Sequence, residues 1–137
     1  LNVEEGWTIV IFTHSLYHVS LPSNELVVIS QPFVDAIDHY QGKGKIACVL
    51  MGHSHVDRVH LGETGVPYII SQCDRTEPYR NDINVDRIPG TISEQHFEVV
   101  LIDKKKQEIR LYSIGSDARN GVDDEVGETV DLRVLNY

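Results

Sequence analysis

Two short apolar runs that both end in histidine limit the folds open to this chain more than any other feature. The first run, 7–13, reads WTIVIFT and is followed by His14. The second, 46–51, reads IACVLM and leads into the tetrapeptide GHSH, which contains His53 and His55. Continuous apolar runs of this length are typical of strands buried in a parallel sheet. Open α/β sheets place polar site residues just beyond the carboxyl ends of such strands, so a histidine site is predicted there.

The segment between the two runs predicts a helix. Ser30 or Gln31 can cap it, and Pro32 suits its first turn. Strand, helix and strand in this order favour a parallel pair joined by a right-handed crossover. Such a pair would place His14 beside the tetrapeptide. The apolar residues expected on one face of the helix are Phe33, Val34, Ile37 and Tyr40.

The three histidines are candidate metal ligands. His53 and His55 are two positions apart, so in extended backbone both imidazoles point the same way. Neutral imidazole binds Zn, Mn, Fe or Ni well. We therefore expect His14, His53 and His55 to bind divalent metal. A surface loop with two solvated histidines is the alternative for the tetrapeptide taken alone.

Two residues near these histidines, His18 and Asp57, each allow two interpretations. His18 lies in the segment 15–24, which is expected to be a loop, and it could contact a substrate phosphate or stay a plain loop histidine. Asp57 could accept a hydrogen bond from a ligand histidine, as metal-bound imidazoles usually require. A simple surface pair between Asp57 and Arg58 is the other interpretation.

Most of the remaining sequence has residue patterns that predict strands and turns. A polar segment, 74–90, interrupts them and carries arginines that could contact a phosphate or remain solvated. Residues 95–103 and 107–114 predict a hairpin across a lysine turn, and 130–135 alternate as an edge strand would. Two shorter strands are expected at 56–61 and 66–71.

Composition narrows the possible partners. The chain has 137 residues, enough for one domain at most, and a formal net charge of −9. This charge disfavours a nucleic-acid partner, because phosphate contacts require clustered Lys and Arg. No apolar stretch is long enough to span a membrane. Two cysteines do not indicate a disulfide framework, and Cys48, inside an apolar run, is expected to be a buried small hydrophobe.

The stretches 11–14 (IFTH) and 51–58 (MGHSHVDR) resemble the C-terminal portion of the calcineurin-like metallophosphoesterase family. The resemblance implies an αββα sandwich, in which a pair of β-sheets lies between helices and a two-metal site lies at the strand ends. It also implies that His14 and His53 bind one metal and His55 the other. The resemblance covers about 7–115.

Three earlier motifs of that family are not in this chain: Asp-x-His, Gly-Asp-x-x-Asp and Gly-Asn-His-Asp/Glu. They supply the remaining metal ligands and the histidine that protonates the leaving group. Two-metal hydrolysis holds its ions roughly 3.5–4 Å apart, which three histidines cannot do alone. We therefore expect 1–137 to be a single partial domain with a C-terminal tail at 116–137, belonging to an enzyme that hydrolyses phosphomonoesters or phosphodiesters. The alternative is a non-catalytic, degenerate family member that serves in binding or assembly.

A partial domain of this kind has two expected properties. A sheet without the missing N-terminal half exposes an apolar face, which favours self-association of the chain. Divalent metal ions (Mn, Zn, Fe or Ni) should bind weakly or be absent, because each ion lacks most of its ligands.

Overall fold

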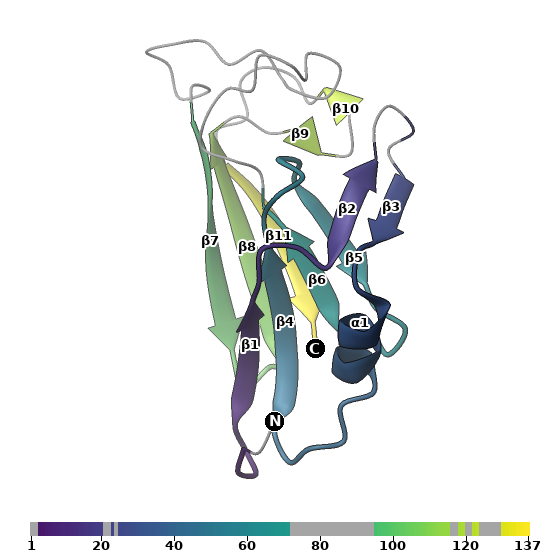
Figure 1. Ribbon diagram of the computed structural model, residues 1–137. Coiled ribbons are helices and arrows are strands. Elements are labelled where there is room, and N and C mark those ends of the chain that lie inside the picture. The colour runs from purple at the N-terminus through teal and green to yellow at the C-terminus, as the bar shows by residue number, and fades with distance from the viewer. Residues whose placement is uncertain are drawn as a thin grey trace.

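The computed structural model describes residues 3–20, 23, 25–71, 95–115, 118–119, 122–123 and 130–137. Strands predominate in this part of the chain, which has one helix, α1 (Gln31–Asp38), so the α/β class with mostly strands is confirmed (Figure 1). The polar segment 74–90 lies outside the described residues. No helix among the described residues is long and apolar enough to cross a membrane.

The two runs that end in histidine are neighbours in a four-stranded sheet of order β1-β4-β6-β5. β1 (Thr8–Phe12) and β4 (Lys45–Met51) pair in parallel, as the sequence predicts. β6 (Pro67–Ile70) continues the parallel pairing on the other side of β4, and β5 (Arg58–Leu61) pairs antiparallel with β6. The carboxyl ends of β1 and β4 therefore lie at the same edge of this sheet.

A second, three-stranded antiparallel sheet has the order β11-β8-β7. Its strands are β7 (His96–Asp103), β8 (Glu108–Gly115) and β11 (Val130–Asn136), which confirms the predicted hairpin and edge strand. Ile109 and Leu111 of β8 are fully buried in a cluster that also contains residues of the first sheet. The two sheets thus pack face to face. β9 (Ala118–Arg119) and β10 (Val122–Asp123) form a separate short antiparallel pair.

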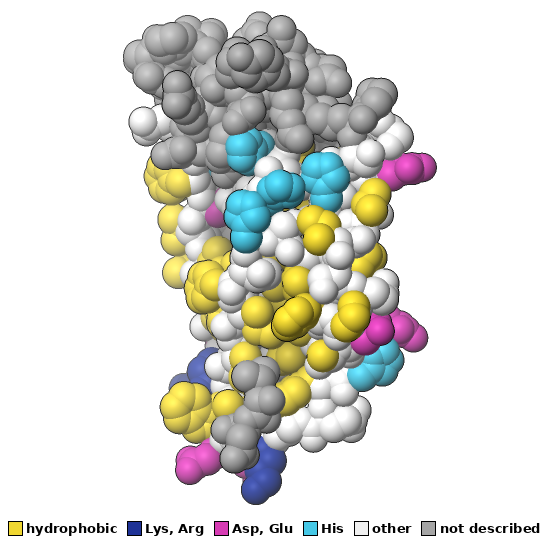
Figure 2. Space-filling view, in the orientation of Figure 1, with side chains coloured by type: hydrophobic (Ala, Val, Ile, Leu, Met, Phe, Trp, Pro, Cys, Tyr) yellow, Lys and Arg dark blue, Asp and Glu magenta, His cyan; other side chains and the backbone are white. Residues whose placement is uncertain are grey.

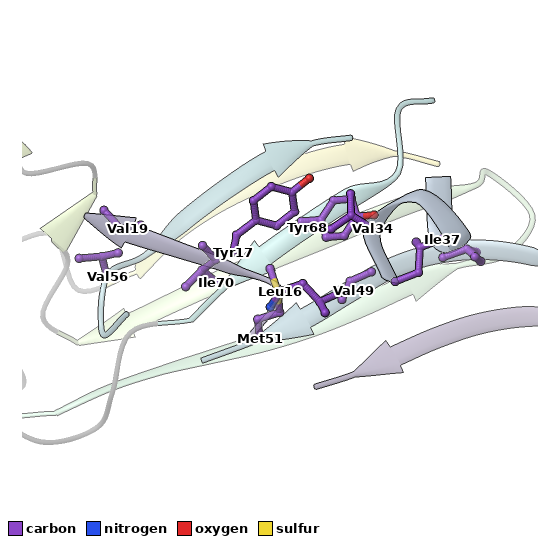
Figure 3. Packing of buried hydrophobic residues seen from close by; sticks show 11 residues of the cluster. Leu16, Tyr17, Val19, Val34, Ile37, Val49, Met51, Val56, Tyr68 and Ile70 are labelled. Atoms are coloured by element: carbon purple, nitrogen blue, oxygen red, sulfur yellow. The ribbon is translucent and has the colours of Figure 1, made fainter. Parts of the chain in front are cut away.

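The central strands of the first sheet are covered on both faces. Ala47 and Cys48 of β4 face the second sheet, whereas Ile46 and Val49 belong to a cluster on the opposite side (Figure 3). Burial raises the pKa of the Cys48 thiol to about 11, which agrees with the expected role of a small core residue. β4 and β6 are buried almost throughout, as an interior parallel strand requires.

The helix and a small hairpin supply the cover on that opposite side. Ser30 is the N-cap of α1 and a proline occupies its first turn, and Val34 and Ile37 are buried against the sheet. The hairpin pairs β2 (Tyr17–Ser20) with β3 (Glu25–Val28). The loop predicted at 15–24 is therefore wrong, because β2 buries alternate side chains with the period of a strand.

The predicted apolar face of the helix is also partly wrong. Phe33 is 66% exposed, and the buried position at the end of α1 belongs to Asp38. The Asp38 carboxylate accepts hydrogen bonds from the Tyr68 hydroxyl at 2.8 Å and from the Glu63 amide at 3.0 Å. Burial together with this bond to Asp38 raises the pKa of Tyr68. These bonds make the burial of a charged residue tolerable and attach the end of the helix to the β5–β6 turn.

The outer face of the second sheet is mostly apolar, with Arg110 between Leu101 and Val134. Alternate residues of β7 and β11 point away from the core, and five of them are between 40% and 53% exposed. Val99 and Leu132 both lie opposite Tyr112 in the register, so the exposed side chains form a continuous row across the sheet. We call this set the outer apolar face, which consists of Phe97, Val99, Leu101, Leu132 and Val134.

We predict that the chain self-associates through the outer apolar face. The double substitution Val99→Lys and Leu132→Lys should weaken association at least tenfold, because it places two charges in the middle of the face. Sedimentation velocity at micromolar concentration measures the effect. Phe33→Lys is the control, since Phe33 is an exposed apolar residue that lies on α1 and not on the outer apolar face. A wild-type chain that sediments as a monomer contradicts the prediction.

Candidate metal centre

The parallel pairing of β1 and β4 brings His14 and His53 into contact. The Thr13 amide donates to the Leu50 carbonyl at 3.1 Å, and the Gly52 amide donates to the His14 carbonyl at 3.1 Å. These bonds continue the pairing beyond the last residues of both strands. The two imidazoles then meet edge to face, with His14 Nε2 and His53 Nδ1 3.0 Å apart.

The spacing of these two nitrogens suits a shared metal ion. Two nitrogens bound to one tetrahedral zinc at about 2.0–2.1 Å each are about 3.3 Å apart. The observed separation of 3.0 Å is close to this value, so a small rotation of either ring would let both nitrogens bind one ion. Without an ion, the same two nitrogens form a hydrogen bond, in which one ring donates and the other accepts.

The loop that carries His53 and His55 is not extended. His53 has φ of 70° and His55 has φ of 56°, so both adopt left-handed backbone. The expectation that both imidazoles point the same way because the backbone is extended is therefore wrong. Left-handed backbone costs a non-glycine residue on the order of 1 kcal/mol or more, and such residues cluster at functional sites.

The predicted third ligand, His55, does not form a close group of ligand atoms with His14 and His53. Figure 2 shows several histidine side chains close together on one face of the molecule. Among the described residues, the His14–His53 pair has no third His, Cys, Asp or Glu whose ligand atom lies within 4.8 Å of both. The contact joins two of the three predicted ligands, and metal binding by His14, His53 and His55 remains a prediction.

His18 lies beside this pair, although it is on a strand and not in a loop. Its ring centroid is 5.4 Å from that of His53. Its Nδ1 atom is 3.4 Å from the hydroxyl oxygen of Ser54, the residue between the two histidines of the tetrapeptide. The hairpin of β2 and β3 therefore brings a third imidazole close to His14 and His53.

A second group of metal-type ligands is buried between the sheets. Asp57, His96 and Glu98 offer ligand atoms that all lie within 4.8 Å of one another, so the group could hold a metal ion. A guanidinium already serves as the cation there, because Arg133 Nη2 lies 2.6 Å from an oxygen of each carboxylate. Ser113 accepts from Arg133 at 3.1 Å and donates to Asp57 at 3.2 Å. An ion in this group would have to displace the guanidinium.

The structure corrects the interpretation of Asp57 as half of a surface pair. Asp57 is fully buried, and its ion pair is with Arg133 of β11. Sequence reasoning missed Arg133 and Glu98, although a signal existed. Glu98 of β7 and Arg133 of β11 each lie between two exposed apolar residues, and both face the interior, as do Val100, Ile102 and Leu135.

Glu98 has an unusual acid–base character. Burial, and secondarily the nearby charge of Asp57, raises the pKa of the Glu98 carboxyl from 4.5 to about 7, although Arg133 opposes the shift. The cause is that two buried carboxylates share one guanidinium. One of the two carboxyls therefore tends to hold a proton near neutral pH.

We predict that this proton makes the protein less stable as the pH rises. The folded state binds the proton more tightly than the unfolded chain does, so the contribution is complete below pH 4.5 and is lost as the pH rises through about 7. The contribution is at most about 3 kcal/mol. Urea unfolding at several pH values between 4 and 8 measures the slope. Glu98→Gln should flatten it, and an unchanged slope in this variant would contradict the assignment.

We also predict that Arg133→Ala unfolds more easily, by about 3–5 kcal/mol, because it leaves two buried carboxylates without their cation. Urea unfolding measures the loss, and Arg110→Ala is the control because Arg110 pairs with Glu108 at the surface.

Added zinc should raise the urea midpoint of Arg133→Ala more than that of the wild type if Asp57, His96 and Glu98 can hold an ion. Equal midpoint shifts would show that they cannot.

Comparison of the chain with protein-family models, with curated proteins and with solved structures gave no match.

Proposed function

We propose that this chain is the metal-binding C-terminal part of a metal-dependent phosphoesterase. The observation that carries the proposal is the 3.0 Å approach of His14 Nε2 to His53 Nδ1 at the carboxyl ends of adjacent parallel strands. This is the position at which open α/β sheets place their sites. The nitrogen spacing is suitable for one divalent ion, with Mn, Zn, Fe or Ni as the candidates.

We infer that the fold is part of a calcineurin-like αββα sandwich. Two sheets pack face to face, and α1 covers the outer side of the first sheet, in support of this inference. The outer apolar face of the second sheet has the character of a surface that another layer covers. A missing N-terminal half of the domain would supply that layer and the remaining metal ligands.

The residues present divide the chemistry in the following way. His14 and His53 would hold one ion, and His55 would contribute to a second whose other ligands come from the missing half. Bound divalent ions polarise a phosphoryl oxygen and lower the pKa of bound water. His18 would contact the phosphate of the substrate, and the position of its ring next to that of His53 supports this role. A bound ion attracts phosphate locally even though the net charge of the chain is −9.

A non-catalytic binding or assembly module is the second candidate. The observation in its favour is that, among the described residues, no third His, Cys, Asp or Glu places a ligand atom within 4.8 Å of both His14 and His53. Such a module would use the outer apolar face for assembly and would need no metal. Metal binding and hydrolysis therefore separate the two candidates.

We predict that the chain binds cobalt or zinc through His14 and His53. His53→Ala should weaken binding at least tenfold, because it removes one of two nitrogens on the same ion. Titration followed by the visible spectrum of cobalt measures the affinity. His39→Ala is the matched control, because His39 is an exposed histidine at the end of α1.

Activity is tested on the product of the complete open reading frame that contains residues 1–137, after its sequence upstream of Leu1 has been read. If that sequence encodes the three absent motifs, the protein should hydrolyse p-nitrophenyl phosphate or bis(p-nitrophenyl) phosphate with at least one of the four metals. His53→Ala should then lower kcat at least a hundredfold, whereas His39→Ala should not. An upstream sequence without the motifs, or no hydrolysis with any of the four metals, would leave the module as the better candidate.

A further inference from the structure

Three lysines from two separate segments of the chain line one small pocket. Lys43 and Lys45 lie at the start of β4, and Lys104 lies in the turn between β7 and β8. The pocket has a volume of about 250 Å³. We call it the lysine pocket, and its lining includes Lys43, Lys45, Lys104, Gln107, Trp7 and Tyr137.

The lysine pocket lies far from the proposed metal site. β4 begins at Lys45 and ends at Met51, next to the tetrapeptide that carries His53. The 7 residues of this strand, at about 3.3 Å each, separate the two ends by roughly 20 Å. Figure 2 shows Lys and Arg side chains at the end of the molecule away from most of the histidines. What the pocket binds therefore does not depend on the proposed function.

Nearby carboxylates do not neutralise the positive charge of the lysine pocket. Among the residues that the structure describes, none of the three lysines forms an ion pair, and no Asp or Glu lines the pocket. Glu4 and Glu5 precede Trp7 in the chain, but neither is part of the lining. The chain has 21 acidic and 12 basic residues, so this grouping of lysines runs against its composition. Like charges held around a pocket favour the binding of an anion between them.

Contacts between distant segments hold one of the three ammonium groups in place. Lys45 Nζ donates to Gln107 Oε1 at 2.7 Å and lies 5.5 Å from the centre of the Tyr137 ring. The Tyr137 amide donates to the Gln107 carbonyl at 3.1 Å. Gln107 has φ of 54°, a left-handed conformation that persists in a non-glycine residue where surrounding contacts maintain it. The Lys45 ammonium is therefore positioned at the pocket before any ligand binds.

The lining determines which ligand the pocket suits. A volume of about 250 Å³ is below the roughly 300–1,000 Å³ of pockets for drug-sized molecules, so a compact group fits. Ammonium groups only donate hydrogen bonds, so the ligand must accept them. A carboxylate carries one negative charge, whereas a phosphate group carries about 1.5 to 2 at pH 7. Two linked phosphates therefore match three ammonium groups better than a carboxylate or a single phosphate does.

We propose that the lysine pocket is a second ligand site, at which Lys43, Lys45 and Lys104 bind a small molecule through a diphosphate group. The diphosphate is either free or attached to a nucleoside. In the second case the base would stack on the indole of Trp7, which is 59% exposed. The two sources share the chemistry that the lysines recognise.

Inorganic pyrophosphate and the fluorescence of Trp7 test the proposal. Trp7 is the only tryptophan in the chain, so its emission reports on this pocket. Titration of the full chain in metal-free buffer with about 50 mM salt should change the emission in a saturable way, with a Kd below about 1 mM. Raising the salt to about 200 mM should weaken binding about threefold or more, because ions screen the lysines. No saturable change in fluorescence, together with no heat in calorimetry, would overturn the proposal.

Lysine substitutions locate the site. Lys43→Gln and Lys104→Gln should each weaken pyrophosphate binding about fivefold, because each removes a charge-assisted hydrogen bond. Both lysines are exposed, so the variants should fold as the wild type does. Lys105→Gln is the matched control, because Lys105 is an exposed lysine of the same turn that does not line the pocket. Equal weakening by Lys104→Gln and Lys105→Gln would indicate attraction by overall charge and would overturn the site.

Two further comparisons separate this site from the metal site and identify the source of the diphosphate. His53→Ala should leave pyrophosphate affinity unchanged in metal-free buffer, and a loss would place the anion at the histidines and overturn the proposal. ADP that binds about fivefold tighter than pyrophosphate, with the gain abolished by Trp7→Leu, identifies a nucleoside diphosphate. Equal affinities identify the free diphosphate. Because neither metal nor hydrolysis enters these measurements, failure of the proposed function would not change their outcome.

Discussion

The parallel pairing of β1 with β4 is the interaction on which the rest of the structure depends. It continues past the end of both strands, through the bond from the Gly52 amide to the His14 carbonyl, so the backbone itself sets the distance between the imidazoles of His14 and His53. The same pairing makes β4 an interior strand, and its burial on both faces forms the cores on either side. A change that shifts this register would move the histidines apart and disrupt both cores together.

A second set of contacts, made by Arg133, holds the loop that carries His53 and His55 in place. Asp57 follows His55 by two residues and is tied to Arg133, which also holds Glu98 of the second sheet. One side chain from the last strand thus connects the base of the loop to β7. Together with the bond between Val19 and Ser54, this places contacts on two sides of a short loop whose histidines have left-handed backbone. Such contacts are what allow a strained conformation to persist.

The sequence predicted those parts of the fold that depend on local pattern. The apolar runs, the helix that follows Ser30 and the lysine hairpin were identifiable because periodicity and turn residues report on neighbours in the chain. The meeting of His14 with His53 followed from the parallel pair. The exposure of Phe33 could not be predicted from the sequence, because it depends on which elements cover the helix. The backbone of His53 and the pairing of Arg133 with Glu98 were missed for the same reason, since each depends on contacts between distant segments.

The position of β1 has a consequence for how the sheet could be extended. In the described sheet β1 has one neighbour, β4, and its other side presents backbone amides and carbonyls at the margin. A strand added in parallel at that margin would point in the same direction as β1 and end at the same edge. Its next residue would arrive beside His14, on the side opposite His53. Extension of the sheet by one strand would therefore also bring a new side chain to the histidine pair, because the hydrogen-bond register sets where that strand ends.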